Sequence, residues 1–194
     1  YLDERRAESE FAEQLVAARR AATGVGEAKS PKETDEPPQK MKDAAPMRPA
    51  DSKLLGRIEI PRVSVSAIVR EGVDAHTLGR GVGHVPGTAV PGEDGNVALA
   101  AHRDRHFRGL RNIQAGDEIR VETTDGVYRY VVESTRIVRP TQVSVLDPTP
   151  EPSITLITCY PFSFIGPAPE RFIVKGRQVR REAGVTAFPE DARF

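Results

Sequence analysis

The sequence has one cysteine and no tryptophan, and aromatic residues make up only 6% of its 194 positions. A single cysteine excludes an intramolecular disulfide and any metal site built from cysteines alone, so the fold must rest on a hydrophobic core. The chain also lacks a charge surplus, because 28 Lys and Arg balance 28 Asp and Glu. A neutral chain is poorly suited to the phosphates of nucleic acids, so no nucleic-acid partner is expected.

Long hydrophobic runs are missing as well. The longest, at residues 15–18 and 97–101, are far shorter than the roughly 20 residues that a membrane helix needs. Because the chain begins with Tyr1 rather than Met, we interpret it as a fragment or processed form whose upstream signal or anchor is absent.

Residues 1–53 have the composition of a stalk. They hold 10 Lys or Arg and 11 Asp or Glu, and Val25 is the only branched aliphatic residue between positions 23 and 53. Such a stretch cannot bury enough apolar surface to offset the entropy of ordering it. The three-to-four spacing of Phe11, Leu15 and Ala18 predicts a solvated helix, and the prolines that follow predict an extended spacer.

Residues 54–194 are predicted to form an all-β domain that ends in a C-terminal tail. Short segments rich in Val, Ile and Tyr recur between Gly, Pro and Asp. Eight strands are expected, at residues 58–60, 63–69, 97–101, 118–123, 127–133, 136–138, 153–158 and 172–174. So many short strands favour a closed barrel, which has no exposed edges. One or two short helices are expected, at 74–78 and 106–112.

Three residues that could perform chemistry stand at the margins of predicted strands. Cys159 and His102 each end an apolar strand, and Arg171 begins a third. Taken singly, they are more often a buried inert thiol, a structural histidine and a solvated strand-end arginine. Together they offer a nucleophile, a proton carrier and a permanent cation with a planar fork of donors. That combination suits acyl transfer at a peptide carbonyl.

The segment Thr-Leu-Ile-Thr-Cys at 155–159 resembles the TLxTC signature of sortases, the cell-surface cysteine transpeptidases. His102 precedes Cys159 by 57 residues and Arg171 follows it by 12, in the order that the family uses. The stretches at 95–102 and 159–162 are also similar to the family. The resemblance runs from about residue 54 to 177 and is strongest to class D sortases, with class E next.

This resemblance implies an eight-stranded barrel that cleaves an LPxTG-like sorting signal between Thr and Gly. Cys159 would form an acyl-thioester, His102 would transfer protons and Arg171 would stabilise the developing negative charge. An amine on a peptidoglycan precursor or a pilin lysine would resolve the thioester, and Thr158 could line the site. No cofactor or metal is implied. The resemblance further implies an extracytoplasmic enzyme at the cell envelope, anchored to the membrane by an N-terminal helix that is absent from this chain.

Three other interpretations remain open from the residues themselves. A hydrolytic cysteine peptidase would use the same thiol and imidazole but would pass the acyl group to water. A non-catalytic barrel could bind peptides while Cys159 stays inert. A metal site could use His102, His106 and Cys159, but four-residue spacing on a strand does not bring two histidines to one ion.

Overall fold

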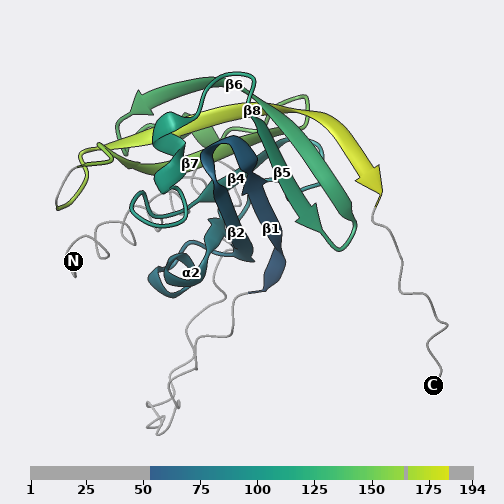
Figure 1. Ribbon diagram of the computed structural model, residues 1–194, viewed down its shortest axis with the longest axis horizontal. Helices are drawn as coiled ribbons and strands as arrows, with labels where there is room; N and C mark the ends of the chain where they lie inside the picture. The colour runs from purple at the N-terminus through teal and green to yellow at the C-terminus, as the bar shows by residue number, and fades with distance from the viewer. Residues whose placement is uncertain (1–52, 164–165, 184–194) are drawn as a thin grey trace, which may run out of the picture.

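The chain folds into a closed barrel of eight strands, most of them antiparallel to their neighbours (Figure 1). The computed structural model describes residues 53–163 and 166–183. The strands are β1 (Leu54–Ile60), β2 (Val65–Glu71), β3 (Val82–His84), β4 (Asn96–Ala100), β5 (Glu118–Thr123), β6 (Gly126–Val138), β7 (Ser153–Tyr160) and β8 (Glu170–Ala183). The described helices are α2 (Ala75–Arg80) and the short 3₁₀ helices η1 (Pro61–Val63), η2 (Arg108–Asn112) and η3 (Val143–Leu146).

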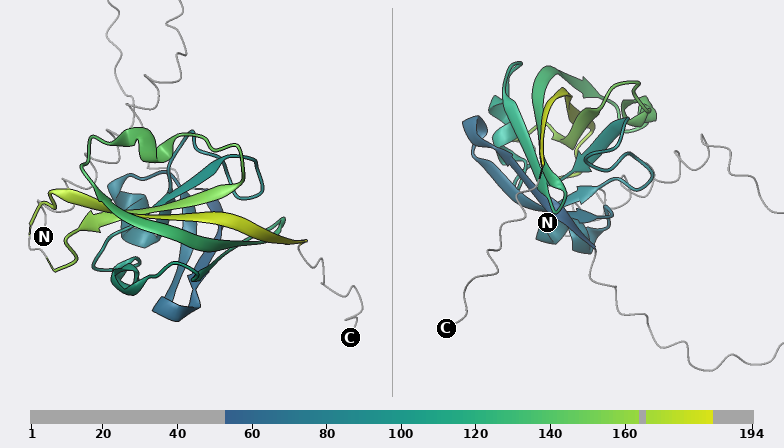
Figure 2. Two further views of the ribbon diagram at one scale, coloured as in Figure 1. Left: turned by 90° about the horizontal axis from the view of Figure 1, so that it is seen from above. Right: turned by 90° about the vertical axis from the view of Figure 1, so that its right-hand side faces the viewer.

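The barrel closes because β1 pairs with β2 on one side and with β5 on the other. Around the barrel the strands follow the order β1-β2-β3-β4-β7-β8-β6-β5. The pairs β2–β3 and β4–β7 are parallel. The two longest strands, β6 and β8, run side by side across the barrel (Figure 2). The predicted all-β closed barrel of eight strands is therefore confirmed.

Strand β7 is buried on both faces. Ile154 and Leu156 belong to the core inside the barrel, whereas Ile157 belongs to a second apolar cluster on the outer face. Leu78 of α2 and Leu146 of η3 cover that outer cluster. A strand covered on both sides reads as a continuous apolar run, which explains the composition of residues 153–159.

The sequence-based prediction was wrong about two strands. Separate strands were expected at 127–133 and 136–138, but β6 runs unbroken through both. A shift in its pairing with β8 between Val132 and Ser134 accommodates the polar residues there without ending the strand. The second error was the omission of β3, whose three residues are too few to show an alternating pattern.

The two predicted helical segments are present. Asp74 precedes α2, and its Oδ1 accepts hydrogen bonds from the backbone N–H groups of His76 (2.9 Å) and Thr77 (3.0 Å). These bonds satisfy donors that the first turn leaves unpaired, as an N-cap does. The second segment forms η2 rather than an α-helix. None of the helices in the described part of the chain is long and apolar enough to cross a membrane.

The boundary between a stalk at 1–53 and a catalytic domain at 54–194 stays a prediction, because most of the stalk and residues 184–194 lie outside the described residues. Lys53 is described, and its carbonyl oxygen accepts a hydrogen bond from Glu71 N–H at 2.8 Å. A truncation should therefore keep Lys53.

We expect that removing residues 1–52 leaves peptide cleavage in solution nearly unchanged. A charged, proline-rich segment has little apolar surface to pack on a barrel that already buries its own core. Turnover and thermal melting of the full and shortened chains test this. A folded but inactive shortened chain would show that the removed segment takes part in the site.

Candidate active site

Cys159 and Arg171 lie directly opposite each other on neighbouring antiparallel strands, β7 and β8. Side chains at such paired positions point to the same face of a sheet, with β-carbons about 4.5–5.5 Å apart. Ile157, two residues before Cys159, and Ile173, two residues after Arg171, share this face and belong to the outer apolar cluster. The thiol and the guanidinium therefore lie together on the outer face of the barrel, at the end of both strands.

His102 joins this pair from β4, the other neighbour of β7. β4 runs parallel to β7, and Ala100 pairs with Ile157. The pairing continues past the end of β4, because Ala101 N–H donates to the Ile157 carbonyl at 3.2 Å. His102 thus follows Ala100 by two residues, just as Cys159 follows Ile157. The fold brings together all three of the residues that the sequence singled out.

All three side chains are buried. Cys159 is 5% exposed, His102 7% and Arg171 4%. The sequence analysis placed all three at the margins of strands, where an arginine is more often solvated, but Arg171 is buried. The described residues of the loop between β7 and β8 lie against this site, because two of its arginines donate hydrogen bonds to them. Arg171 Nη1 donates to the carbonyls of Ala168 (3.0 Å) and Glu170 (2.9 Å) and so fixes one end of that loop.

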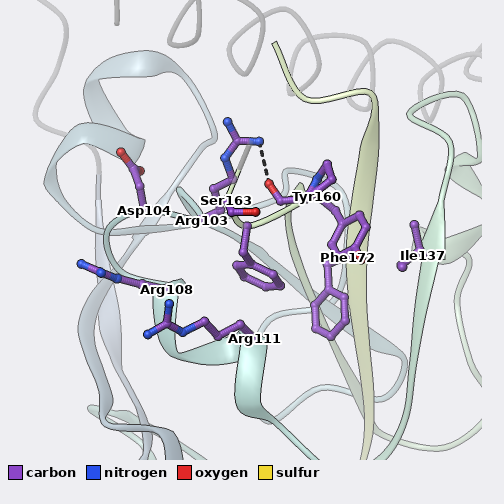
Figure 3. A pocket seen from close by; sticks show the side chains of 10 residues that line it. Arg103, Asp104, Arg108, Arg111, Ile137, Tyr160, Ser163 and Phe172 are labelled. Carbon is purple, nitrogen blue, oxygen red and sulfur yellow. Dashed lines mark hydrogen bonds between the residues drawn. The ribbon is translucent and has the colours of Figure 1, made fainter. Parts of the chain in front are cut away.

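Arg103, which the sequence analysis did not single out, fixes the other end of the loop. Arg103 is 2% exposed, and its Nη1 donates to the Pro161 carbonyl at 3.1 Å (Figure 3). Its Nη2 donates to the Gly166 carbonyl at 3.1 Å. Arg103 directly follows His102, and Pro161 lies two residues after Cys159. The hydrogen bonds of the Arg103 guanidinium therefore connect the segment that carries His102 to the segment that carries Cys159. Nothing in the run of Arg103, Asp104 and Arg105 distinguishes the buried arginine from its exposed neighbour.

We expect Arg103→Met to lower the free energy of unfolding by about 2–4 kcal/mol, because two charged hydrogen bonds in a buried place are lost. Denaturant unfolding measures this loss. Arg105→Met is the matched control, since Arg105 is exposed and donates only to the Gly79 carbonyl at 3.2 Å. Equal stability of the two variants would contradict the role of Arg103.

Thr158 has a buried hydroxyl that donates to the Ala101 carbonyl at 2.7 Å. By strand alternation its side chain faces away from Cys159. The bond fixes the backbone just before His102, so Thr158 supports the site from behind. A contact between Thr158 and substrate stays a prediction.

Asn96 is a second residue that the sequence analysis missed. Its amide Nδ2 donates to the carbonyls of Val145 (3.0 Å) and Asp147 (3.2 Å), and its Oδ1 accepts from Thr155 Oγ1 at 2.7 Å. These bonds fasten η3 and the residue after it onto β4 and β7. The outer apolar cluster beneath the site is thereby held in place.

His106 is the second histidine near the site. Partial burial and the neighbouring charges of His102 and Arg105 lower the pKa of its imidazole. The shift favours the neutral form of the His106 imidazole. In the described ranges, no three His, Cys, Asp or Glu side chains gather in a way that could hold a metal ion.

A cavity of about 860 Å³ lies at this end of the barrel. One wall holds the arginines 103, 108 and 111 with Asp104, and the other holds Ile137 and an aromatic cluster (Figure 3). The cluster consists of Tyr160, Phe162 and Phe172, with ring centroids 5.3–6.3 Å apart. Edge-to-face and stacked rings at such distances stabilise one another. No periodic pattern of residues predicted this wall.

The chain is similar to known proteins over the whole of this region. The Sortase family model, described as a sortase domain, matches residues 58–179. Sortase D of Bacillus subtilis is 35% identical over 156 residues, which cover 78% of this chain and 79% of that protein. Sortase SrtE1 of Streptomyces coelicolor is 38% identical over 123 residues, which cover 54% of this chain and 35% of that protein.

Solved structures agree with these similarities. The crystal structure of Listeria monocytogenes sortase A has a TM-score of 0.63 at 30% identity and covers 69% of this chain and 92% of its own. Sortase E1 of Streptomyces coelicolor, solved with a tripeptide in its active site, has a TM-score of 0.60 at 31% identity and covers 68% and 91%. The resemblance to class D sortases, with class E next, is confirmed, and the chain belongs to the sortase family of cysteine transpeptidases.

Proposed function

We propose that this sortase cleaves an LPxTG-like sorting signal between Thr and Gly and that Cys159 is its nucleophile. The Cys159 thiolate attacks the Thr carbonyl carbon, a C–S bond forms and the C–N bond to Gly breaks. His102 gives its proton to the leaving amine. The donor protein is left as a thioester on Cys159.

In the second half of the proposed reaction an amine acceptor resolves the thioester. His102 removes a proton from the incoming amine, whose nitrogen attacks the thioester carbonyl. A new C–N bond forms, the C–S bond breaks and the thiolate returns. The acceptor is an amine of the cell envelope, either on a peptidoglycan precursor or on a pilin lysine.

Arg171 stabilises the negative charge that develops on the carbonyl oxygen in both steps. Its bonds to Ala168 and Glu170 hold the guanidinium across from Cys159 before substrate arrives. A donor fixed in advance costs little reorganisation when charge develops. The observation that carries the proposal is the direct pairing of Cys159 with Arg171, with His102 just past the end of the adjoining strand β4.

The test is to incubate the protein with a small library of LPxTG-like peptides, with and without an added amine. Mass measurement should show a thioester on Cys159, and a ligated product should replace the hydrolysed one when amine is present. A product that stays hydrolytic at saturating amine would favour the peptidase interpretation. An unlabelled Cys159 after treatment with a peptide vinyl sulfone would favour the non-catalytic one.

The proposal also places the enzyme outside the cytoplasm, held at the membrane of the cell envelope by an N-terminal anchor. The support is the envelope location of the sortase family and the composition of residues 1–53, which suits a spacer. Fractionation of cells that make the native protein tests this, because the protein should remain with the membrane in high salt.

A further inference from the structure

We propose that the cavity between Arg108, Arg111 and the aromatic cluster binds the amine acceptor through a free carboxylate. The ligand class is a short peptide with a nucleophilic amine at one end, an apolar side chain and an anionic group. The inference rests on the proposed function and adds to it a site for the second substrate.

The position of the cavity is the first argument. Its lining includes Arg103, Tyr160 and Phe172, each of which directly follows one of the three active-site residues in the sequence. The cavity therefore borders the backbone of His102, Cys159 and Arg171 at once, at the end of the barrel where their strands begin or end. A peptide seated there can direct its amine around this end toward His102.

The second argument is that the donor has a different place to bind. The Cys159 and Arg171 side chains face the outer side of β7 and β8, whereas Phe172 pairs with Thr158 and faces the other side. The acyl part of the donor must lie on the outer side, because its carbonyl carbon has to reach the thiol. The cavity remains available to another peptide while the thioester is in place.

The third argument is charge. Arg108 and Arg111 are exposed, and neither has an ion-pair partner among the residues that the structure describes. Asp104 is the single acidic residue of the lining, against three arginines. Arg103 is already engaged with the Pro161 and Gly166 carbonyls, so the two exposed arginines supply the donors. Two guanidinium groups next to an apolar wall match a carboxylate attached to an apolar residue.

Gly109 holds this pair of arginines in place. It lies between them in sequence in η2, and a β-carbon there would collide with the Val63 carbonyl oxygen. The absence of a side chain lets η2 pack directly on η1. The arginine wall is thus carried by a close backbone contact and not by a free loop.

The experiment compares two acceptors that share one amine, glycyl-glycyl-leucine and its C-terminal amide, at a fixed concentration of an LPxTG-like donor. In the unmodified protein we expect the acid to have the lower apparent KM, by about five- to tenfold, as two exposed charge pairs would give. In the Arg108→Gln/Arg111→Gln variant this ratio should fall to near one. The Arg108→Lys/Arg111→Lys variant should keep part of it, because the charge remains while the planar fork is lost.

The matched control is Arg57→Gln/Arg180→Gln, which removes two exposed arginines away from the cavity. It should keep the full ratio, because their charges are screened over about 8 Å at physiological salt. Titration of both peptides into Cys159→Ala, followed by calorimetry, gives the same comparison without turnover. Equal binding of acid and amide, or a ratio that the Gln variant leaves intact, would overturn the inference.

The outcomes separate this inference from the proposed function. If no thioester forms with any donor peptide, the proposed function fails whatever the cavity binds. If the thioester forms but acid and amide acceptors behave alike, only the acceptor site fails. Donor peptides can also be compared that end, after the scissile bond, in either a free carboxylate or an amide. If the Gln variant changes the ratio of turnover between these two donors, the cavity binds the leaving segment of the donor and the inference is wrong.

Discussion

Cys159→Ala should abolish both cleavage and ligation of an LPxTG-like peptide. Under the proposed mechanism no other side chain can form the thioester, so loss of the sulfur removes the reaction path and does not merely slow it. The fold should survive, because the change removes one small buried atom and should cost about 1–2 kcal/mol at most. The measurement is turnover with and without amine, together with thermal melting.

An inert structural cysteine would give the opposite pattern. Replacement would then lower the melting temperature while peptide turnover stayed near that of the unmodified protein. The intact protein should also react at Cys159 with a peptide vinyl sulfone, whereas Cys159→Ala should not. Turnover by the alanine variant above the uncatalysed rate would remove Cys159 as the nucleophile.

Arg171→Lys should lower turnover by about 10² to 10³, the range observed when one preorganised donor to a developing oxyanion is lost. The guanidinium has several N–H donors, and its Nη1 alone serves the carbonyls of Ala168 and Glu170. A lysine has one nitrogen on a flexible stem. It cannot hold the loop at both carbonyls and also direct a fixed donor across the strand pair toward Cys159.

The control for Arg171→Lys is Arg177→Lys on the same strand. Arg177 pairs with Glu133 at 3.3 Å and its side chain is well exposed, so lysine should change stability there by less than about half a kcal/mol. Melting curves decide whether lost turnover reflects unfolding. Near-normal turnover by folded Arg171→Lys would exclude Arg171 as a geometry-specific donor.

The strands that the sequence predicted well have a local signal, either a continuous apolar run or alternation beside a turn. β5 and the first part of β6 were visible because their residues alternate on either side of the turn at Thr124 and Asp125, where the two strands pair. β3 could not be predicted, because its three buried residues form a strand only by pairing with β2 and β4. Long-range pairing of this kind leaves no local pattern.

The residues of the candidate active site also fall into two groups, those that the sequence singled out and those that only the fold revealed. Cys159, His102 and Arg171 were identified from their residue types and from their positions at strand ends. Arg103 and Asn96 were not, because an arginine or an asparagine near a loop is usually solvated. Only the fold shows that the Arg103 side chain reaches the carbonyls of Pro161 and Gly166.

The sequence by itself determined the class of fold, and it singled out the three chemical groups that the fold brings to one place. Apolar alternation, turn residues and a short motif are local properties, and each is complete within a few neighbouring positions. The tertiary structure alone decided that Cys159 lies opposite Arg171, that the site is buried and that Arg108 and Arg111 line one cavity with an aromatic cluster. Register and burial depend on which strands meet when the barrel closes, and the energy of that closure is shared among residues far apart in the chain.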